Sequence, residues 1–121
     1  MKDPILRVVL FPRPTAIWGT SAVSSEPFRS KDFCQAVVVA GARTGMGATP
    51  ATVSVTLEQS ADGVRWFTIG SALTPAANDE DTDAFDLDLE WMRATATVTG
   101  GSPGVTMWAV AGMVPRVSSG Q

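Results

Sequence analysis

The stretch from Val53 to Trp66 constrains the fold of this chain more than any other, because it has the pattern of a β-hairpin. Apolar and polar residues alternate along its first half, which reads Val53, Ser54, Val55, Thr56, Leu57, Glu58. A period of two is typical of a strand that buries one face. Asp62 can then accept hydrogen bonds from its own backbone, and Gly63 tolerates a positive φ. The pattern therefore predicts a turn there and a return strand from Val64 to Ile69.

Similar patterns of apolar and polar residues continue through the rest of the chain and predict an all-β protein. Apolar or alternating runs indicate strands at 5–11, 33–40, 53–58, 64–69, 85–91, its continuation 92–98, and 105–114. No segment has a convincing helical period. We therefore expect an antiparallel β-sandwich of about seven short strands. A jelly roll or a closed barrel is the near alternative.

A single domain accounts for all 121 residues, a length that can bury one core without disulfide or metal support. Prolines at 12 and 14 are expected to close the first strand, because proline cannot donate to a β-ladder. Residues 12–32 are then expected to be irregular, and the tail at 116–121 is expected to fray. Residues 71–83, rich in Pro, Ala and acidic side chains, are predicted to form an exposed loop.

Composition excludes several classes of chemistry. Histidine is absent and Cys34 is the only cysteine, so a disulfide within the chain, a Cys/His zinc site and a His-dependent catalytic triad are ruled out. Cys34 leads into the apolar run 36–40 and is expected to be a buried, inert thiol. A net charge of −3 with nine scattered basic residues argues against a nucleic-acid partner.

Membrane insertion and export are not expected either. No segment approaches the ~20 consecutive apolar residues of a membrane span. Residues 1–4 and the short β-like run after them lack the features of a signal peptide. We therefore expect a protein that stays in the cytoplasm where it is made, or in a particle assembled there.

The acidic residues are expected to form an outward-facing surface, with no catalytic site, no metal and no cofactor. They are Asp79, Glu80, Asp81, Asp83, Asp86, Asp88 and Glu90. Such oxygen ligands suit Ca²⁺, but their spacing does not match the twelve-residue calcium loop. A solvated acidic loop is favoured over a cation site and over contact with basic residues of a partner. Asp86 and Asp88 come with no identifiable cleft for paired-carboxylate catalysis, so we expect a protein that is not an enzyme.

The tryptophans divide into two groups. Trp66 and Trp91 stand at in-register positions of alternating strands and are expected in the core. Trp108 lies in a strand with two apolar faces, so the strand is either central in a sandwich or covers a partner. Large apolar groups in the irregular region either mark a docking surface or plug an open end of the sandwich. The candidate partner interface consists of Ile17, Trp18, Phe28 and Trp108.

Three segments, at 52–70, 91–100 and 105–110, resemble small β-sandwich structural proteins encoded beside the head genes of tailed bacteriophages. The likeness covers residues 35–114 and is closest to capsid decoration (cement) and accessory head proteins. It implies a non-enzymatic virion protein on the capsid exterior, assembled in the host cytoplasm, which stabilises contacts between major capsid protein subunits. Its partners would be the major capsid protein and neighbouring copies of itself, with residues 12–31 as a docking arm.

The hairpin motif Ser-x-Asp-Gly-x-x-Trp at 60–66 also occurs in discoidin-like sugar-binding sandwiches. The alternative function is therefore a carbohydrate-binding β-sandwich module, in a phage fibre or a bacterial enzyme. In that case Trp18 or Trp108 would serve as a platform for stacking a sugar ring.

Overall fold

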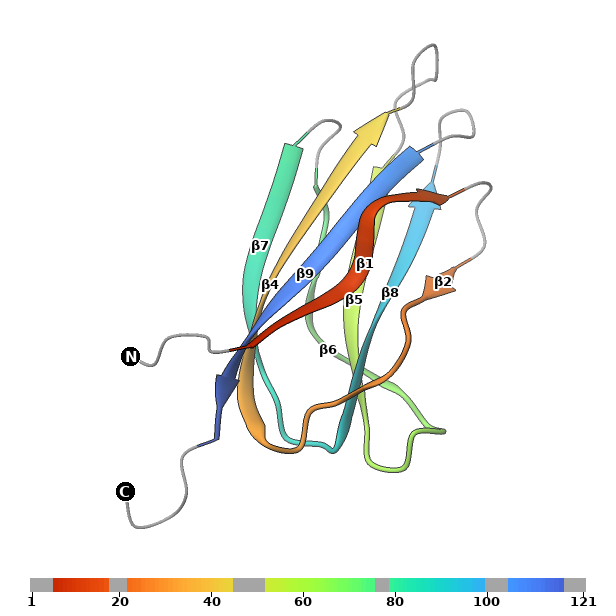
Figure 1. Cartoon of the computed structure of the whole chain (residues 1–121). Coiled ribbons are helices and arrows are strands. Elements are labelled where there is room, and N and C mark those ends of the chain that lie inside the picture. The colour runs from red at the N-terminus through yellow and green to blue at the C-terminus, as the bar shows by residue number, and fades with distance from the viewer. Residues whose placement is uncertain (1–5, 18–21, 45–51, 76–78, 100–104, 117–121) are drawn as a thin grey trace.

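The computed structural model describes residues 6–17, 22–44, 52–75, 79–99 and 105–116, and all regular structure in this part is β. The strands are β1 (Leu6–Ile17), β2 (Val23–Ser24), β3 (Phe28–Arg29), β4 (Phe33–Thr44), β5 (Thr52–Ser60), β6 (Phe67–Leu73), β7 (Asp79–Asp86), β8 (Trp91–Thr99) and β9 (Val105–Pro115). Figure 1 shows them as two layers.

The two layers are antiparallel sheets. Sheet A has the order β1-β9-β4-β7, and sheet B has the order β2-β8-β5-β6 with β3 also paired to β8. Every strand pair within them is antiparallel. The chain is thus an all-β sandwich, as the alternating pattern predicts. The described residues form nine strands, whereas about seven were expected. The two additional strands are β2 and β3, which have only two residues each.

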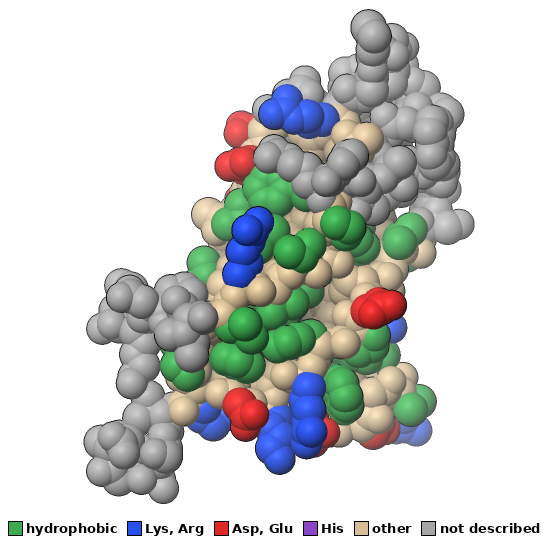
Figure 2. Space-filling view, in the orientation of Figure 1, with side chains coloured by type: hydrophobic (Ala, Val, Ile, Leu, Met, Phe, Trp, Pro, Cys, Tyr) green, Lys and Arg blue, Asp and Glu red, His purple; other side chains and the backbone are tan. Residues whose placement is uncertain are grey.

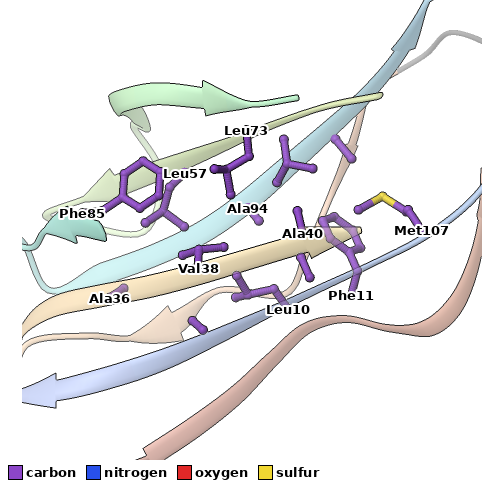
Figure 3. Close-up of a cluster of buried hydrophobic side chains, with 14 of the residues drawn as sticks. Leu10, Phe11, Ala36, Val38, Ala40, Leu57, Leu73, Phe85, Ala94 and Met107 are labelled. Atoms are coloured by element: carbon purple, nitrogen blue, oxygen red, sulfur yellow. The ribbon is translucent and has the colours of Figure 1, made fainter. Parts of the chain in front are cut away.

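The core lies between the sheets and follows the period-two pattern. Val53, Val55 and Leu57 of β5 are buried, and their polar neighbours face outward. Alanines supply much of the opposing surface, and large side chains from several strands fill the space between the layers (Figure 3). Full burial of one Val or Leu side chain contributes about 1.5–3 kcal/mol, so the alternation itself fixes which face of each strand packs inward.

The turn after β5 confirms the predicted turn chemistry. Ser60 Oγ accepts hydrogen bonds from the N–H groups of Asp62 and Gly63, at 3.3 and 2.8 Å. Asp62 Oδ1 accepts from the N–H groups of Val64 and Arg65, at 2.8 and 3.0 Å. Gly63 has a φ of 80°. These bonds hold the chain in a turn as far as Arg65, so the return strand begins at Phe67 and not at Val64.

Stability below neutral pH is expected to depend on Asp62. The N–H groups of Arg65 and Val64 and the hydroxyl of Ser60 hold the pKa of this carboxyl below its ordinary value. A group whose pKa is lowered by folding stabilises the protein above its unfolded pKa of about 4, and that contribution is lost as the pH falls through the lowered value. Denaturant unfolding at a series of pH values should show a smaller acid-induced loss for Asp62→Asn than for the unaltered protein. Parallel profiles for the two proteins would contradict this expectation.

The N-terminal segment is more ordered than the sequence suggests. β1 does not end at the prolines but continues to Ile17, with register shifts against β9 around Phe11 and Thr15. Prolines are tolerated there because β1 is an edge strand of sheet A and does not need every N–H. Within 12–32, β2 and β3 also pair with β8. The prediction of an irregular segment at 12–32 was therefore wrong for these strands, holds for 22, 25–27 and 30–32, and for 18–21 lies outside the described residues.

The acidic region is also different from the prediction. Residues 79–83 belong to β7, which pairs with β4, and β6 occupies 67–73, so 71–83 is not one exposed loop. A single strand over 85–91 was wrong as well. β7 ends at Asp86, and 87–90 cross from sheet A to sheet B. The crossing keeps apolar and polar residues alternating, so the pattern gives no sign of it.

Arg116, at the start of the expected frayed tail, is anchored. Its backbone N–H donates to the carbonyl of Asp32 at 2.9 Å. Its Nη2 donates to the carbonyls of Phe33 and Leu87, at 3.0 and 3.1 Å. The fraying prediction was therefore wrong for Arg116, and the rest of the tail lies outside the described residues.

Candidate functional site

The candidate functional site is the outer face of sheet A. On β9 the residues Met107, Ala109, Ala111 and Met113 are buried in the core, which turns Trp108 and Val110 to the other side. Register places Val9 of β1, Val110 of β9 and Val39 of β4 side by side in one row of this outer side. Val9 is 51% exposed and the other two are half-buried.

Together with Val37, these residues make up what we call the sheet A face: Val9, Val37, Val39, Trp108 and Val110. Figure 2 looks onto this side of the molecule and shows hydrophobic side chains gathered in a band over β1, β9 and β4. A contiguous exposed apolar surface of this kind marks a binding site more often than single exposed apolar residues do.

Trp108 owes its position to Gly41. The two residues are paired across β9 and β4, and a Cβ added to Gly41 would overlap the indole of Trp108. The missing side chain therefore lets the indole lie on the backbone of β4. Beside it is a hollow of about 350 Å³, lined by Arg7, Val9, Phe11, Pro12, Trp108 and Val110. The central position of β9 in its sheet confirms one of the two interpretations of this strand, and the other, that its outer face covers a partner, stays a prediction.

Charges of opposite sign border the sheet A face. Arg7 stands on β1, in the row of Gly112, Val37 and Ala84. On β7 at the other border, Glu80 and Asp86 occupy outward positions, in register with Gly41 and Gln35. Arg7, Glu80 and Asp86 are all exposed. The surface is therefore apolar along its middle, basic at one edge and acidic at the other.

The free edge of β7 is blocked by its own aspartates. Alternate N–H groups of an edge strand point away from the sheet and can pair with another chain. In β7 the N–H groups of Glu80, Thr82 and Ala84 donate instead to Oδ1 of the preceding aspartates, Asp79, Asp81 and Asp83, at 2.8, 2.9 and 2.8 Å. Asp81 Oδ2 also accepts from the N–H of Thr74 at 3.0 Å. These carboxylates therefore satisfy the donors that a foreign strand would need.

Replacing Asp79, Asp81 and Asp83 together with alanine is expected to open this edge. The three freed N–H groups can then pair with the edge of another molecule, so light scattering should detect species larger than those of the unaltered protein. A variant with Glu26, Asp32 and Asp88 replaced by alanine loses the same charge from exposed positions elsewhere. If both variants associate to the same extent, net charge and not edge blocking is responsible.

Trp66 and Trp91 are not in the core, and that prediction was wrong. Both are half-buried. Register pairs Trp91 with Ser60 and Arg93 with Glu58, so the inward position between them on β8 goes to Met92. The Arg93 guanidinium lies 4.3 Å from the ring centroid of Trp66, and Arg93 Nε is 2.7 Å from Glu58 Oε1. The outer face of sheet B therefore carries a cation–π contact and an ion pair.

Of the predicted interface residues, Phe28 and Trp108 lie on different sheets. Phe28 lies on β3 of sheet B, partly buried against the core, with its ring centroid 6.0 Å from that of Phe33. Trp108 lies on the outer side of sheet A. Ile17 ends β1, where its backbone pairs with Val105, and Trp18 lies outside the described residues.

Sequence reasoning missed Val9 and Gly41, because only the strand pairing brings them beside Trp108. A glycine inside an apolar strand was the one available sign of a close approach.

Cys34 is half-buried and not fully buried as expected, and its Sγ donates a weak hydrogen bond of 3.5 Å to the carbonyl of Pro115.

In the part of the chain that the structure describes, no three His, Cys, Asp or Glu side chains are grouped so that they could hold a metal ion. Among the same residues no helix is long and apolar enough to cross a membrane.

Comparison with known proteins identifies the fold. No protein-family model and no curated protein matches the chain. Among solved structures, the PBSX exported protein XepA has a TM-score of 0.70 at 16% identity over 96% of this chain. A structure of infectious bursal disease virus strain Gx has a TM-score of 0.51 at 9% identity, covering 95% of this chain and 37% of that one. A carbohydrate-binding module of the CBM4 class has 0.50 at 15% identity, covering 78% and 61%. This chain spans only 41% of XepA, and at these identities the likeness establishes a shared β-sandwich fold.

Proposed function

We propose that this protein is a non-enzymatic virion structural protein that binds the outer surface of a phage capsid and stabilises contacts between major capsid protein subunits. The observation that carries the proposal is the sheet A face, where Val9 remains 51% exposed beside four half-buried apolar side chains. Covering apolar surface contributes about 25 cal/mol per Å². A subunit whose apolar sheet face is covered by a neighbouring subunit gains this free energy in an assembled particle.

Two further features support a role in a particle. Residues 35–114 resemble capsid decoration proteins, and the fold is shared with XepA, which is described as a PBSX exported protein. The blocked edge of β7 suits a protein held at high local concentration, because unprotected edges would pair with one another there.

Co-sedimentation with expanded capsids that lack the protein tests this function. The unaltered protein is expected to sediment with the capsids and to raise their resistance to heat. Val9→Glu places a charge on the sheet A face and is expected to weaken binding. Val64→Glu is the matched control, because Val64 is 78% exposed in the turn after β5, away from that face.

Failure of the unaltered protein to sediment with the capsids or to protect them would contradict the proposed function. Equal losses for the two glutamate variants would instead show that the sheet A face has no special part in it.

A carbohydrate-binding role is the second proposal, and the outer face of sheet B favours it. Trp66 and Trp91 lie there half-buried, and the paired strands β5 and β8 carry Thr56 and Thr95 at outward positions of the same face. Indole rings beside hydroxyl groups are typical of surfaces that bind sugars. Binding on a glycan array that is lost in Trp66→Ala or Trp91→Ala would support this role, and absence of any glycan binding would contradict it.

A further inference from the structure

We propose that the sheet A face packs against the same face of a second copy of this chain, about a two-fold axis that runs parallel to the strands. This contact deepens the proposed function, because it names a second copy of the chain as the subunit that covers the sheet A face. Only the role of the dimer in a particle rests on the proposed function. A two-fold contact must be self-complementary. If one residue of the first chain meets a second residue of its partner, the same two residues also meet with the chains exchanged. Size, charge and the pattern of side chains each bear on this requirement.

The whole outer side of sheet A, of which the sheet A face is the middle, has the size of a standard interface. Four strands about 4.8 Å apart and eleven residues at about 3.4 Å each span on the order of 700 Å². Stable protein contacts bury about 800 Å² on each partner. Sheet A has four strands, of which β1, β4 and β9 have 12, 12 and 11 residues. Sheet-on-sheet packing is also the way in which this chain already builds its own core.

The positions of the charged residues determine the direction of the two-fold axis. Rotation about an axis parallel to the strands places β1 over β7 of the partner, at the same level along the strands. Arg7 then faces the partner's Ala84, two residues from Asp86, about 7 Å along the strand and within reach of a long guanidinium side chain. An axis across the strands would instead place β1 over β1 and β7 over β7 of the partner, so that the basic edge meets the basic edge and the acidic edge meets the acidic edge. Only the first arrangement brings opposite charges together, and it does so twice in each dimer.

The apolar residues agree with this axis. It places β9 over β4 of the partner, so Val110 in the middle row faces Val39 and Gly112 faces Val37. Trp108 leans from β9 onto Gly41, so the two indoles of a dimer lie beside each other next to the axis. The row that contains Val9 fills the centre of the contact, and Arg7 and Asp86 lie on its rim, where charged residues are expected.

A dimer gives the proposed function its bridging property. In the dimer the sheet A face joins the two chains, so each chain meets the capsid through its remaining surface, and Val9→Glu weakens capsid binding by breaking the link. A single chain attaches to one capsid subunit, whereas two linked chains hold two neighbouring subunits. Linkage raises the effective concentration at the second site and increases avidity without any new contact.

Charge reversal on the full-length purified protein tests the inference without capsids. The unaltered protein is expected to have twice the chain mass of 12.7 kDa in sedimentation equilibrium. Arg7→Glu and Asp86→Arg are each expected to raise the dissociation constant by on the order of 10- to 100-fold, because each change makes both rim contacts repulsive. Both side chains are exposed, so thermal unfolding followed by circular dichroism should show that the variants fold.

Mixing the two variants gives the decisive result. In a mixed dimer the glutamate at 7 meets the arginine at 86 of the partner, and Arg7 meets Asp86, so both contacts become attractive again. Native mass spectrometry should therefore find the mixed dimer in preference to either homodimer. Arg65→Glu, an equal charge change at an exposed position in the turn after β5, is the matched control and should remain dimeric.

A monomeric unaltered protein at about 100 μM would overturn the inference, as would a mixture that forms no mixed dimer. Either result leaves the capsid co-sedimentation of the unaltered protein to decide the proposed function by itself. Conversely, a dimer that does not bind capsids would overturn the proposed function and retain this contact.

Discussion

Replacing Gly70 with alanine is expected to lower the free energy of unfolding by about 2 to 5 kcal/mol. Gly70 has a φ of 63°, a conformation that costs other residues about 1–2 kcal/mol. A Cβ there would stand 2.8 Å from Cδ2 and Cε2 of Phe85. Phe85 is a core residue of β7, so the added methyl group overpacks the core there, at a cost of about 1–3 kcal/mol.

Gly63→Ala separates the two causes. Gly63 also has a positive φ, of 80°, but a Cβ there would meet nothing closer than Trp91 Nε1 at 3.8 Å. Urea unfolding should therefore show a smaller loss for Gly63→Ala, limited to about 1–2 kcal/mol for the backbone conformation. Equal losses for the two variants would show that Phe85 does not pack against Gly70 as described.

Replacing Gln59 with methionine is expected to cost about 2 to 3 kcal/mol, although the two side chains have nearly the same size. Gln59 is 2% exposed. Its Oε1 accepts from the N–H of Asp88 at 3.0 Å, and its Nε2 donates to the carbonyl of Leu89 at 3.4 Å and to Ser30 Oγ at 3.5 Å. Methionine leaves the N–H of Asp88 without its partner, at the point where the chain crosses from sheet A to sheet B, whereas Ser30 Oγ and the carbonyl of Leu89 keep the 3.1 Å bond between them.

Gln35→Met makes the same change at a half-buried position on the outer side of β4. It is expected to alter stability by no more than about 0.5 kcal/mol. Hydrogen exchange provides a second measurement. The exchange rate of the Asp88 amide should rise in Gln59→Met and should be the same in Gln35→Met as in the unaltered protein. A stable Gln59→Met protein with a protected Asp88 amide would contradict the role assigned to Gln59.

The sequence contains signals for both of these positions. Gln59 follows Val53, Val55 and Leu57 at the same spacing of two residues. The alternation along this strand therefore predicts that its polar side chain points into the core. Gly70 interrupts a β-rich run, which is typical of a bulge. In the structure β6 indeed has three residues opposite one residue of β5 at this point. The partners, Phe85 and the crossing at 87–90, are not apparent from the sequence because strand order decides them.

The candidate site could be predicted only in part. Trp108 stands out as a large apolar residue on a strand with two apolar faces. Apart from Val110, its neighbours on the sheet A face come from β1 and β4, separated from it by more than 60 positions along the chain. Register places Val9 and Gly41 beside it, and register follows from which strands pair and which residues they bury.

The sequence by itself determined the β class, the inward face of β5 and the chemistry of the turn at 60–63, because these depend on residues within a few positions of one another. The tertiary structure alone decided that the aspartates of 79–83 protect an edge, that Trp66 and Trp91 face outward, and that opposite charges border the sheet A face. Each of these depends on which strand lies at the edge of a sheet and which strand lies beside it. A period of two identifies a strand's two faces but not its neighbours, and the free energy of packing the two sheets together selects among the possible arrangements.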